Sequence, residues 1–274
     1  MGVQETTNSL YNLRLLNTIQ SSTALSWQRS TAANQLASTG QEWAAAFATA
    51  SSGTYTNQWM VLDFHKFTPG QSPNQGFLVV YEEVPGLYHY EDMTSTLIDQ
   101  TFWSSYNNPY FSDIREASGY QKLCDAGVSG NCYDQAPRSI IFREQQASVT
   151  DLASMQSIMR YNHWQTDAAS DGDSCHTIAC RGDLEANGDN VGPFGALDAK
   201  VSSVMLNKLT LPTQAANGGT GSSDSSNDGC NAFAILGPTH QTQAVFCWSN
   251  VQNRSNYMHN GQPDCFDFDW VTMH

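Results

Sequence analysis

Seven cysteines give this 274-residue chain its widest range of possible chemistry, since a thiolate can attack a carbonyl, ligate a metal or form a disulfide. Cys124 and Cys132 flank the glycine-rich loop DAGVSGN, which predicts a local disulfide, and Cys175 and Cys180 form the next candidate pair. An odd total leaves one cysteine without a partner within the chain. A buried cysteine that packs as a small apolar side chain is the alternative for each of them. Three more lie in the C-terminal third: Cys230, Cys247 and Cys265.

Other catalytic and metal-binding patterns are missing from the sequence. The cysteines have no C-x-x-C or H-x-x-x-H spacing, so we predict no metal site and no cofactor. The loop that begins at Asp224 matches the start of a calcium-binding loop, but Ile235 occupies the position that needs a bidentate carboxylate. Serine-hydrolase elbows, dinucleotide fingerprints and P-loops are also lacking.

Charge excludes two classes of partner. The net charge of −14 argues against nucleic acid and against docking on anionic membranes, and it suits an acidic or extracellular fluid. No apolar run is long enough to span a membrane, and the first residues do not read as a signal peptide. Gly2 and Thr6 fit a myristoylation pattern, but that pattern is too short to be specific.

Apolar periodicity predicts an α+β fold in one domain over residues 1–274. Helices are expected at 23–51 (two consecutive helices), 92–103 and 148–163, with a capping box at Thr39–Glu42 that opens the second. Strands are expected at 56–67, 76–84, 87–90 and 198–206, with small sheet pieces near 244–249 and 266–271 and a short apolar segment at 139–143. Polar loops are expected at 166–176 and 214–229.

Six segments resemble, in order, the phospholipase B-like family of N-terminal nucleophile hydrolases. They are SSGTYTNQWMVLDF at 51–64, EEVPG at 82–86, FWSSYNNPYF at 102–111, PRSIIFREQ at 137–145, SIMRYN at 157–162 and GQPD at 261–264. The resemblance implies a four-layer αββα sandwich, truncated at its N-terminus and lacking some N-terminal strands. It also places the stretch around Gly2 and Thr6 inside a buried strand.

In that family a cysteine freed by self-cleavage is the nucleophile, and its own α-amine is the base. The resemblance places the nucleophile upstream of Met1, because none of the seven cysteines is close to a chain start. It implies pocket roles for Thr6, Asn107 and Arg138, with the Asn107 amide and the Arg138 guanidinium converging on one cavity. Without it, Asn107 reads as a turn residue before Pro109, and Arg138 as a surface ion-pair former.

Other matched positions are expected to be structural. Arg181 and Asp183 are expected to pair, although Arg181-Gly182-Asp183 is also an adhesion-like tripeptide. Asn253 heads the only glycosylation sequon, which suits a secreted, lysosomal or otherwise lumenal protein. Asn57, Gln58 and Trp59 are expected to satisfy buried backbone groups, and the expected buried charges are Asp63, Arg160 and Asp183.

The resemblance therefore predicts a hydrolase that cleaves acyl ester or amide bonds of lipids, with this chain as its C-terminal part. The expected partners are an acyl substrate and the N-terminal segment of the same precursor. The alternatives are a catalytically dead lipid-binding or structural remnant, and a lipid carrier without hydrolysis. Because a truncated sheet exposes strand edges, we expect poor solubility of the isolated chain.

Overall fold

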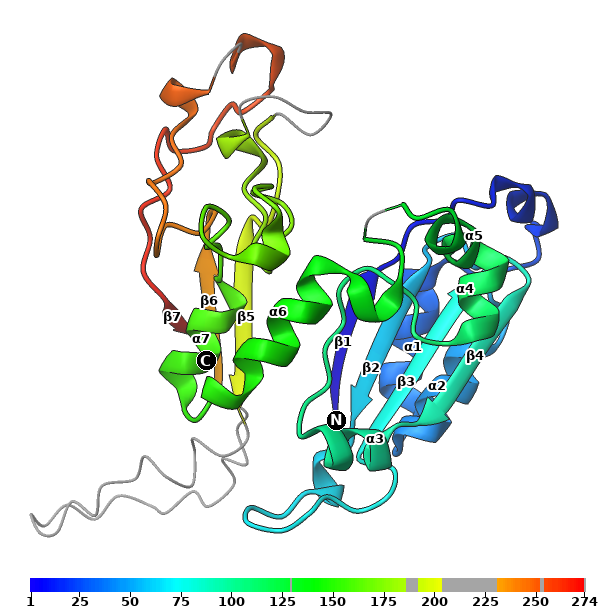
Figure 1. Cartoon of the computed structure of the whole chain (residues 1–274). Helices are drawn as coiled ribbons and strands as arrows, with labels where there is room; N and C mark the ends of the chain where they lie inside the picture. Colours follow the sequence, from blue (N-terminus) through cyan, green and yellow to red (C-terminus); the bar gives the residue numbers. More distant parts are fainter. Residues whose placement is uncertain (129, 186–191, 204–230, 252–253, 274) are drawn as a thin grey trace, which may run out of the picture. The chain divides into compact units, whose positions relative to one another are not determined.

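A computed structural model describes residues 1–273, except residues 129, 186–191, 204–230 and 252–253 (Figure 1). The described chain divides into two compact units, Met1–Ile140 and Ile141–His274, and each unit is considered by itself. Both units combine helices with antiparallel strands, which confirms the α+β class. The single domain stays a prediction.

The first unit is built on a four-stranded antiparallel sheet of order β1-β2-β3-β4 (Figure 1). The strands are β1 (Gly2–Thr7), β2 (Asn57–Leu62), β3 (Leu78–Val84) and β4 (Leu87–Asp92). Pro85 and Gly86 form the two-residue turn between β3 and β4, and Gly86 has a φ of +83° that glycine adopts without strain. β1 is half-exposed at an edge of this sheet, so the expectation of a buried strand is wrong within the described structure.

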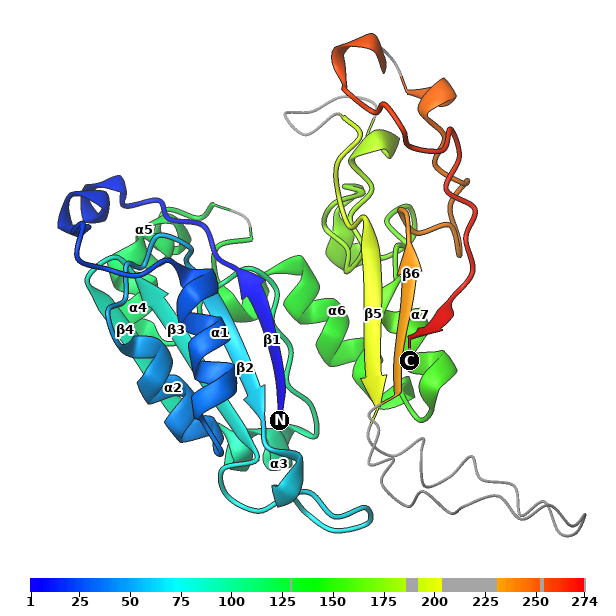
Figure 2. The ribbon, with the colours of Figure 1, turned by 180° about the vertical axis from the view of Figure 1, so that it is seen from behind.

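Helices cover both faces of the sheet. On one face, α1 (Ser26–Leu36) and α2 (Gly40–Ala48) enclose a core that includes Trp43, Phe47 and Trp59 (Figure 2). On the other, α3 (Thr94–Gln100) and α4 (Ser112–Ser118) pack on β3, and α5 (Tyr120–Asp125) packs on α4 (Figure 1). The two faces follow from period-2 alternation along each strand.

The expected capping box is half confirmed. The Thr39 hydroxyl accepts a hydrogen bond from the Glu42 amide at 3.2 Å, as the motif requires. The Glu42 carboxylate, however, accepts from the Ser38 amide at 2.8 Å rather than from that of Thr39. Both bonds still satisfy backbone donors at the start of α2.

A buried ion pair joins α1 to the central strand. Both terminal nitrogens of Arg29 donate to the Glu83 carboxylate, and both side chains are buried. Ser51 and Tyr81 donate to the same carboxylate through their hydroxyls, at 2.6 Å and 2.8 Å. The Arg29 guanidinium also lies 4.1 Å from the centre of the Phe47 ring, a cation–π contact. These bonds compensate for the burial of two charges.

The second unit contains α7 (Leu152–Met159), which packs on β5 of a three-stranded sheet. The strand order is β5 (Asp198–Ser203), β6 (Asn231–Leu236) and β7 (Val271–Met273). α6 (Pro137–Gln145) spans the division between the two units.

Two buried arginines brace the second unit. Arg181 pairs with Asp183 through two 2.7 Å bonds, which confirms the structural reading of the adhesion-like tripeptide. Arg160 instead donates to the carbonyls of Gly237 and Pro238 at 2.7 Å and 2.9 Å. In the first unit, Asp63 accepts from the backbone and ring of His65. Arg160 and Asp63 are buried, as expected, and each is held by hydrogen bonds.

Several element predictions need correction. The expected strand at 56–67 ends at Leu62 and continues as a 3₁₀ turn at Phe64–Lys66. The apolar segment 139–143 is part of the helix α6, and the expected helix 148–163 shortens to α7. The sequence pattern did not predict α4, α5 or β6. Of the small sheet pieces, only β7 and an isolated bridge between Cys247 and Cys265 form.

Three disulfides join six of the cysteines. Cys124–Cys132 and Cys175–Cys180 are the two predicted pairs. The third, Cys247–Cys265, had been left open by the sequence. Cys230, together with the expected 214–229 loop, lies outside the described residues.

Replacing Glu83 by glutamine should strongly destabilise the first unit, because the Arg29 charge then stays buried without its partner. We expect a loss of about 3–5 kcal/mol in the free energy of unfolding, measured by urea denaturation. The exposed Glu116→Gln is the control and should change little. A second change, Arg29→Met in the Glu83→Gln background, should restore part of the loss; no restoration would contradict the ion-pair explanation.

Candidate active site

Asn107 occupies a strained turn in the segment between α3 and α4. Its φ of +61° lies in the left-handed region, which non-glycine residues rarely adopt. The Tyr120 hydroxyl donates to the Asn107 carbonyl at 2.7 Å, and that same hydroxyl accepts from the Ser9 amide at 3.0 Å. The turn is therefore held from α5 and from the segment that follows β1, as a strained functional residue requires.

The structure brings Asn107 and Arg138 together, as the family resemblance predicted, while the cavity between them stays a prediction. A terminal nitrogen of Arg138 donates to the Asn107 amide oxygen at 2.6 Å. The Asn107 amide nitrogen donates to the Thr7 carbonyl at 2.5 Å. An amide nitrogen carries two hydrogens, and this bond uses one of them. The three residues come from β1, a loop and α6, yet they form one hydrogen-bonded group.

The guanidinium of Arg138 is half-buried, and this burial lowers its pKa from the ordinary value of arginine. The phenols of Tyr120 and Tyr106 act in the opposite direction. Even with this lowered pKa, the Arg138 side chain carries its proton at every physiological pH. The site therefore holds a fixed positive charge in a partly water-excluded place, where it acts strongly on a nearby negative charge.

Thr6, the third predicted site residue, directly precedes Thr7 on β1. Its register partner on β2 is Gln58, so the two side chains share one face of the sheet. Thr7, the next residue, supplies the carbonyl that holds the Asn107 amide. Thr7, which the sequence did not single out, thus belongs to the hydrogen-bonded group around Asn107. The catalytic roles of Thr6, Asn107 and Arg138 stay predictions.

Sequence reasoning also missed Glu82, which is fully buried on the same face of the sheet as Thr6. Its carboxylate accepts from the Gln58 side chain at 2.7 Å and from the backbone amides of Tyr110 and Phe111 at 2.7 Å and 3.0 Å. Burial raises the pKa of Glu82 to about 7, against the effect of these bonds. The sequence does contain a signal for it: two successive glutamates follow the run LVVY within β3. The Asn57 amide, by contrast, is buried without a hydrogen-bond partner, so it does not satisfy backbone groups as expected.

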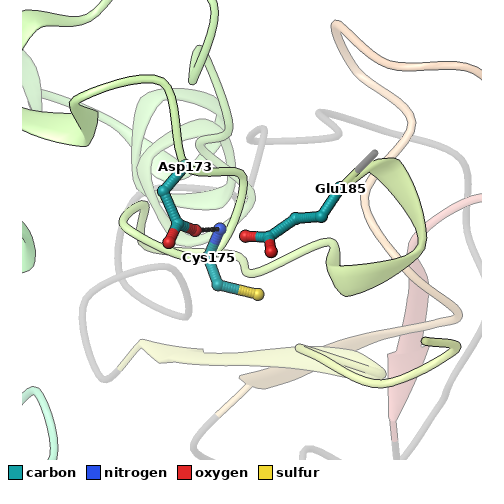
Figure 3. Close-up of side chains that lie close together, drawn as sticks. All are labelled: Asp173, Cys175 and Glu185. Carbon is teal, nitrogen blue, oxygen red and sulfur yellow. Dashed lines mark hydrogen bonds between the residues drawn. The ribbon is translucent and has the colours of Figure 1, made fainter. Parts of the chain in front are cut away.

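Three residues of the second unit lie close enough together to hold a metal ion, but the sulfur of one of them is already bonded. Ligand atoms of Asp173, Cys175 and Glu185 lie within 4.8 Å of one another (Figure 3). The Cys175 sulfur is bonded to Cys180, and Asp173 accepts from the Cys175 amide at 2.6 Å. A hydrogen bond with Asp173, together with burial, raises the pKa of Glu185 to about 7. Asp173 therefore favours the protonated form of Glu185, and the sulfur of Cys175 is not available to a metal as a thiolate.

The described cysteines offer no free thiol, because all six are in disulfides. Asn253, the predicted glycosylation site, lies outside the described residues. In the described part of the chain, no helix is long and apolar enough to cross a membrane. The acyl chemistry expected of the Asn107 group thus needs a nucleophile that these residues do not supply.

A sequence profile for phospholipase B matches residues 1–273. The chain belongs to the phospholipase B family. It is 40% identical over 270 residues to the rat protein named phospholipase B-like 1, and 37% identical over 273 residues to phospholipase B-like protein B of Dictyostelium discoideum. It is also 36% identical over 271 residues to a phospholipase B of the snake Crotalus adamanteus.

These alignments cover 98–99% of this chain but only 44% of each of the three relatives. The chain therefore spans less than half the length of these family members. Membership accounts for the order of the matched motifs, and the Asn107 and Arg138 motifs fall within the aligned region.

The strained turn predicts that Asn107→Gly and Asn107→Ala differ in stability. Both variants lose the two side-chain hydrogen bonds, but only alanine keeps the penalty of the left-handed backbone. We expect Asn107→Ala to be less stable by about 1 kcal/mol in urea denaturation, since that is the usual left-handed cost. Equal stabilities of the two variants would show that the turn is not strained.

The raised pKa of Glu185 predicts that the stability of the second unit depends on pH. A carboxyl group whose pKa is raised from 4.5 to about 7 contributes stability that is present below pH 4.5 and lost as the pH rises through about 7. Glu185→Gln should flatten this part of the stability profile between pH 5 and 8, followed by thermal unfolding. An unchanged slope in that variant would assign the effect to another group.

Proposed function

We propose that this chain carries the substrate and oxyanion side of the active site of a thiol-dependent acyl hydrolase that acts on lipids. The observation that carries the proposal is the 2.6 Å bond from Arg138 to the Asn107 amide oxygen. A charged donor on its oxygen polarises an amide, so the second hydrogen of the Asn107 nitrogen becomes a stronger donor. Such a preorganised donor stabilises the oxyanion of acyl transfer.

The proposed reaction has two steps. A cysteine thiolate attacks the acyl carbonyl, and the Asn107 amide hydrogen and the Arg138 charge stabilise the tetrahedral oxyanion. Collapse breaks the bond to the alcohol or amine, which leaves with a proton, and forms a thioester. Water then hydrolyses the thioester to the fatty acid and regenerates the thiol.

The thiol comes, in this proposal, from a segment of the same precursor that precedes residue 1. All described cysteines are in disulfides, and the family relatives are more than twice as long as the matched region. With that segment, the complete fold is a four-layer αββα sandwich. The three disulfides suit an oxidising compartment, so we place the protein in a secreted or lysosomal location with Asn253 glycosylated.

The test is fatty-acid release from phospholipid vesicles by the full-length protein. Asn107→Gly keeps the backbone turn and removes the amide, so we expect kcat to fall about 10²–10³-fold. Asn17→Ala, an exposed change outside the site, serves as the control and should leave kcat unchanged.

Thiol alkylation of the full-length protein separates the alternatives. Loss of fatty-acid release after alkylation supports the thiol-dependent hydrolase. A protein that binds lipid but releases no fatty acid before alkylation would instead be a lipid-binding or structural member of the family, and the proposed function would be wrong.

A further inference from the structure

Glu82 is a buried carboxyl group that no catalytic step described above uses. It lies at the centre of the four-stranded sheet, on β3, and its side chain is fully buried. Among the described residues no ion pair involves it, and its hydrogen bonds come from neutral donors. One carboxylate oxygen accepts from Gln58 and from the Tyr110 amide, and the other accepts from the Phe111 amide. A carboxyl group is costly to bury, so its presence here calls for an explanation.

The two backbone donors identify what Glu82 holds. Tyr110 and Phe111 end the loop that carries Asn107, and Pro109, which directly precedes Tyr110, has no N–H to donate. The Tyr110 amide is therefore the first backbone donor after the proline, and Glu82 binds it at 2.7 Å. Tyr110 follows Asn107 by three positions in the chain, a span of about 10 Å at most. If the Tyr110 amide moves away from Glu82, the turn at Asn107 is therefore displaced as well.

A row of side chains on one face of the sheet connects Glu82 with Thr6 on β1. Thr6, Gln58, Glu82 and His89 are successive register partners across the four strands, so their side chains form one row. Gln58 donates to Glu82 and accepts from the Trp103 indole at 3.2 Å. The row begins at Thr6, beside the carbonyl that holds the Asn107 amide.

We propose that Glu82 is a positioning residue of the candidate active site, whose carboxyl group anchors the 107–111 loop and so aims the Asn107 amide at the oxyanion. This inference rests on the proposed function for its catalytic consequence, but the anchoring itself does not. Glu82 acts through the loop and touches no reacting atom. Its neighbour Glu83 faces the other side of the sheet and has no access to this loop.

The protonation of Glu82 determines how the stability of the closed 107–111 loop changes with pH. Its pKa is raised to about 7 by burial, so opening that hydrates the carboxyl group favours the ionised form. By linkage, the closed loop is most stable at acidic pH and weakens as the pH rises through 7. The facing groups are His89 on β4, whose positive charge opposes this shift, and the Tyr133 phenol. His89 is itself bonded to Asp113 and Glu91, which raise its pKa against desolvation.

Amide hydrogen exchange on the full-length protein tests the anchor without reference to activity. In the wild type, protection of the Tyr110 and Phe111 amides should fall as the pH rises from 5 to 8, after correction for intrinsic exchange. Even when protonated, the Glu82 carboxyl group keeps two oxygens that can accept a hydrogen bond, whereas the NH2 group of a glutamine side chain only donates. Protection in Glu82→Gln should therefore fall about tenfold at pH 5 and lose its pH dependence. Phe47, in the core of the opposite face, reports global unfolding, and Glu116→Gln is the matched exposed control.

The outcomes separate the inference from the proposed function. The inference would be overturned, whatever the activity, if protection in Glu82→Gln were unchanged or fell no more than that of the Phe47 amide. It would also be overturned if the pH dependence persisted in the variant, because that dependence would then belong to His89. If the loop loosens, kcat for fatty-acid release should fall at least about tenfold with little change in KM. A loosened loop with unchanged kcat in an active enzyme would also overturn it. An inactive wild type would contradict the proposed function alone, since the exchange data still judge the anchor.

Discussion

Two adjacent carboxylates on the central strand hold the first unit together. Successive residues of a strand point to opposite faces, so Glu82 and Glu83 reach into different layers of the same fold. Glu83 binds Arg29 of α1 on one face, and Glu82 binds the backbone of the 110–111 segment on the other. Because burying a carboxylate is costly unless it is bonded, each layer must keep its place for the strand to be stable.

The candidate site inherits its geometry from this arrangement. Asn107 adopts a backbone conformation that is unfavourable by itself, and it is maintained by partners on β1, α5 and α6. One end of its loop is fixed by the Arg138 bond and the other by Glu82. Preorganisation of this kind places a donor before the reaction begins, which is how electrostatic stabilisation acts in enzymes.

The sequence predicted the elements that depend on local pattern and the residues that family resemblance marks. The helices around Trp43, the two short-range disulfides and the meeting of Asn107 with Arg138 belong to this class. It missed α4 and α5, whose short helices lack a clear apolar period, and it missed the role of Glu82. A buried carboxylate is recognised only when its donors are known, and those of Glu82 lie 24–29 residues away in the chain.

The three crosslinks have a consequence for how the polypeptide withstands cleavage. They close over 8, 5 and 18 residues, and each lies entirely within one compact unit. Such short rings restrict the unfolded chain less than long ones and serve to fasten local loops. Among the described residues no sulfur bridge ties one half to the other, so covalent continuity between Ile140 and Ile141 depends on the peptide backbone alone. A single proteolytic nick in α6 would leave two oxidised fragments that only non-covalent forces can keep together.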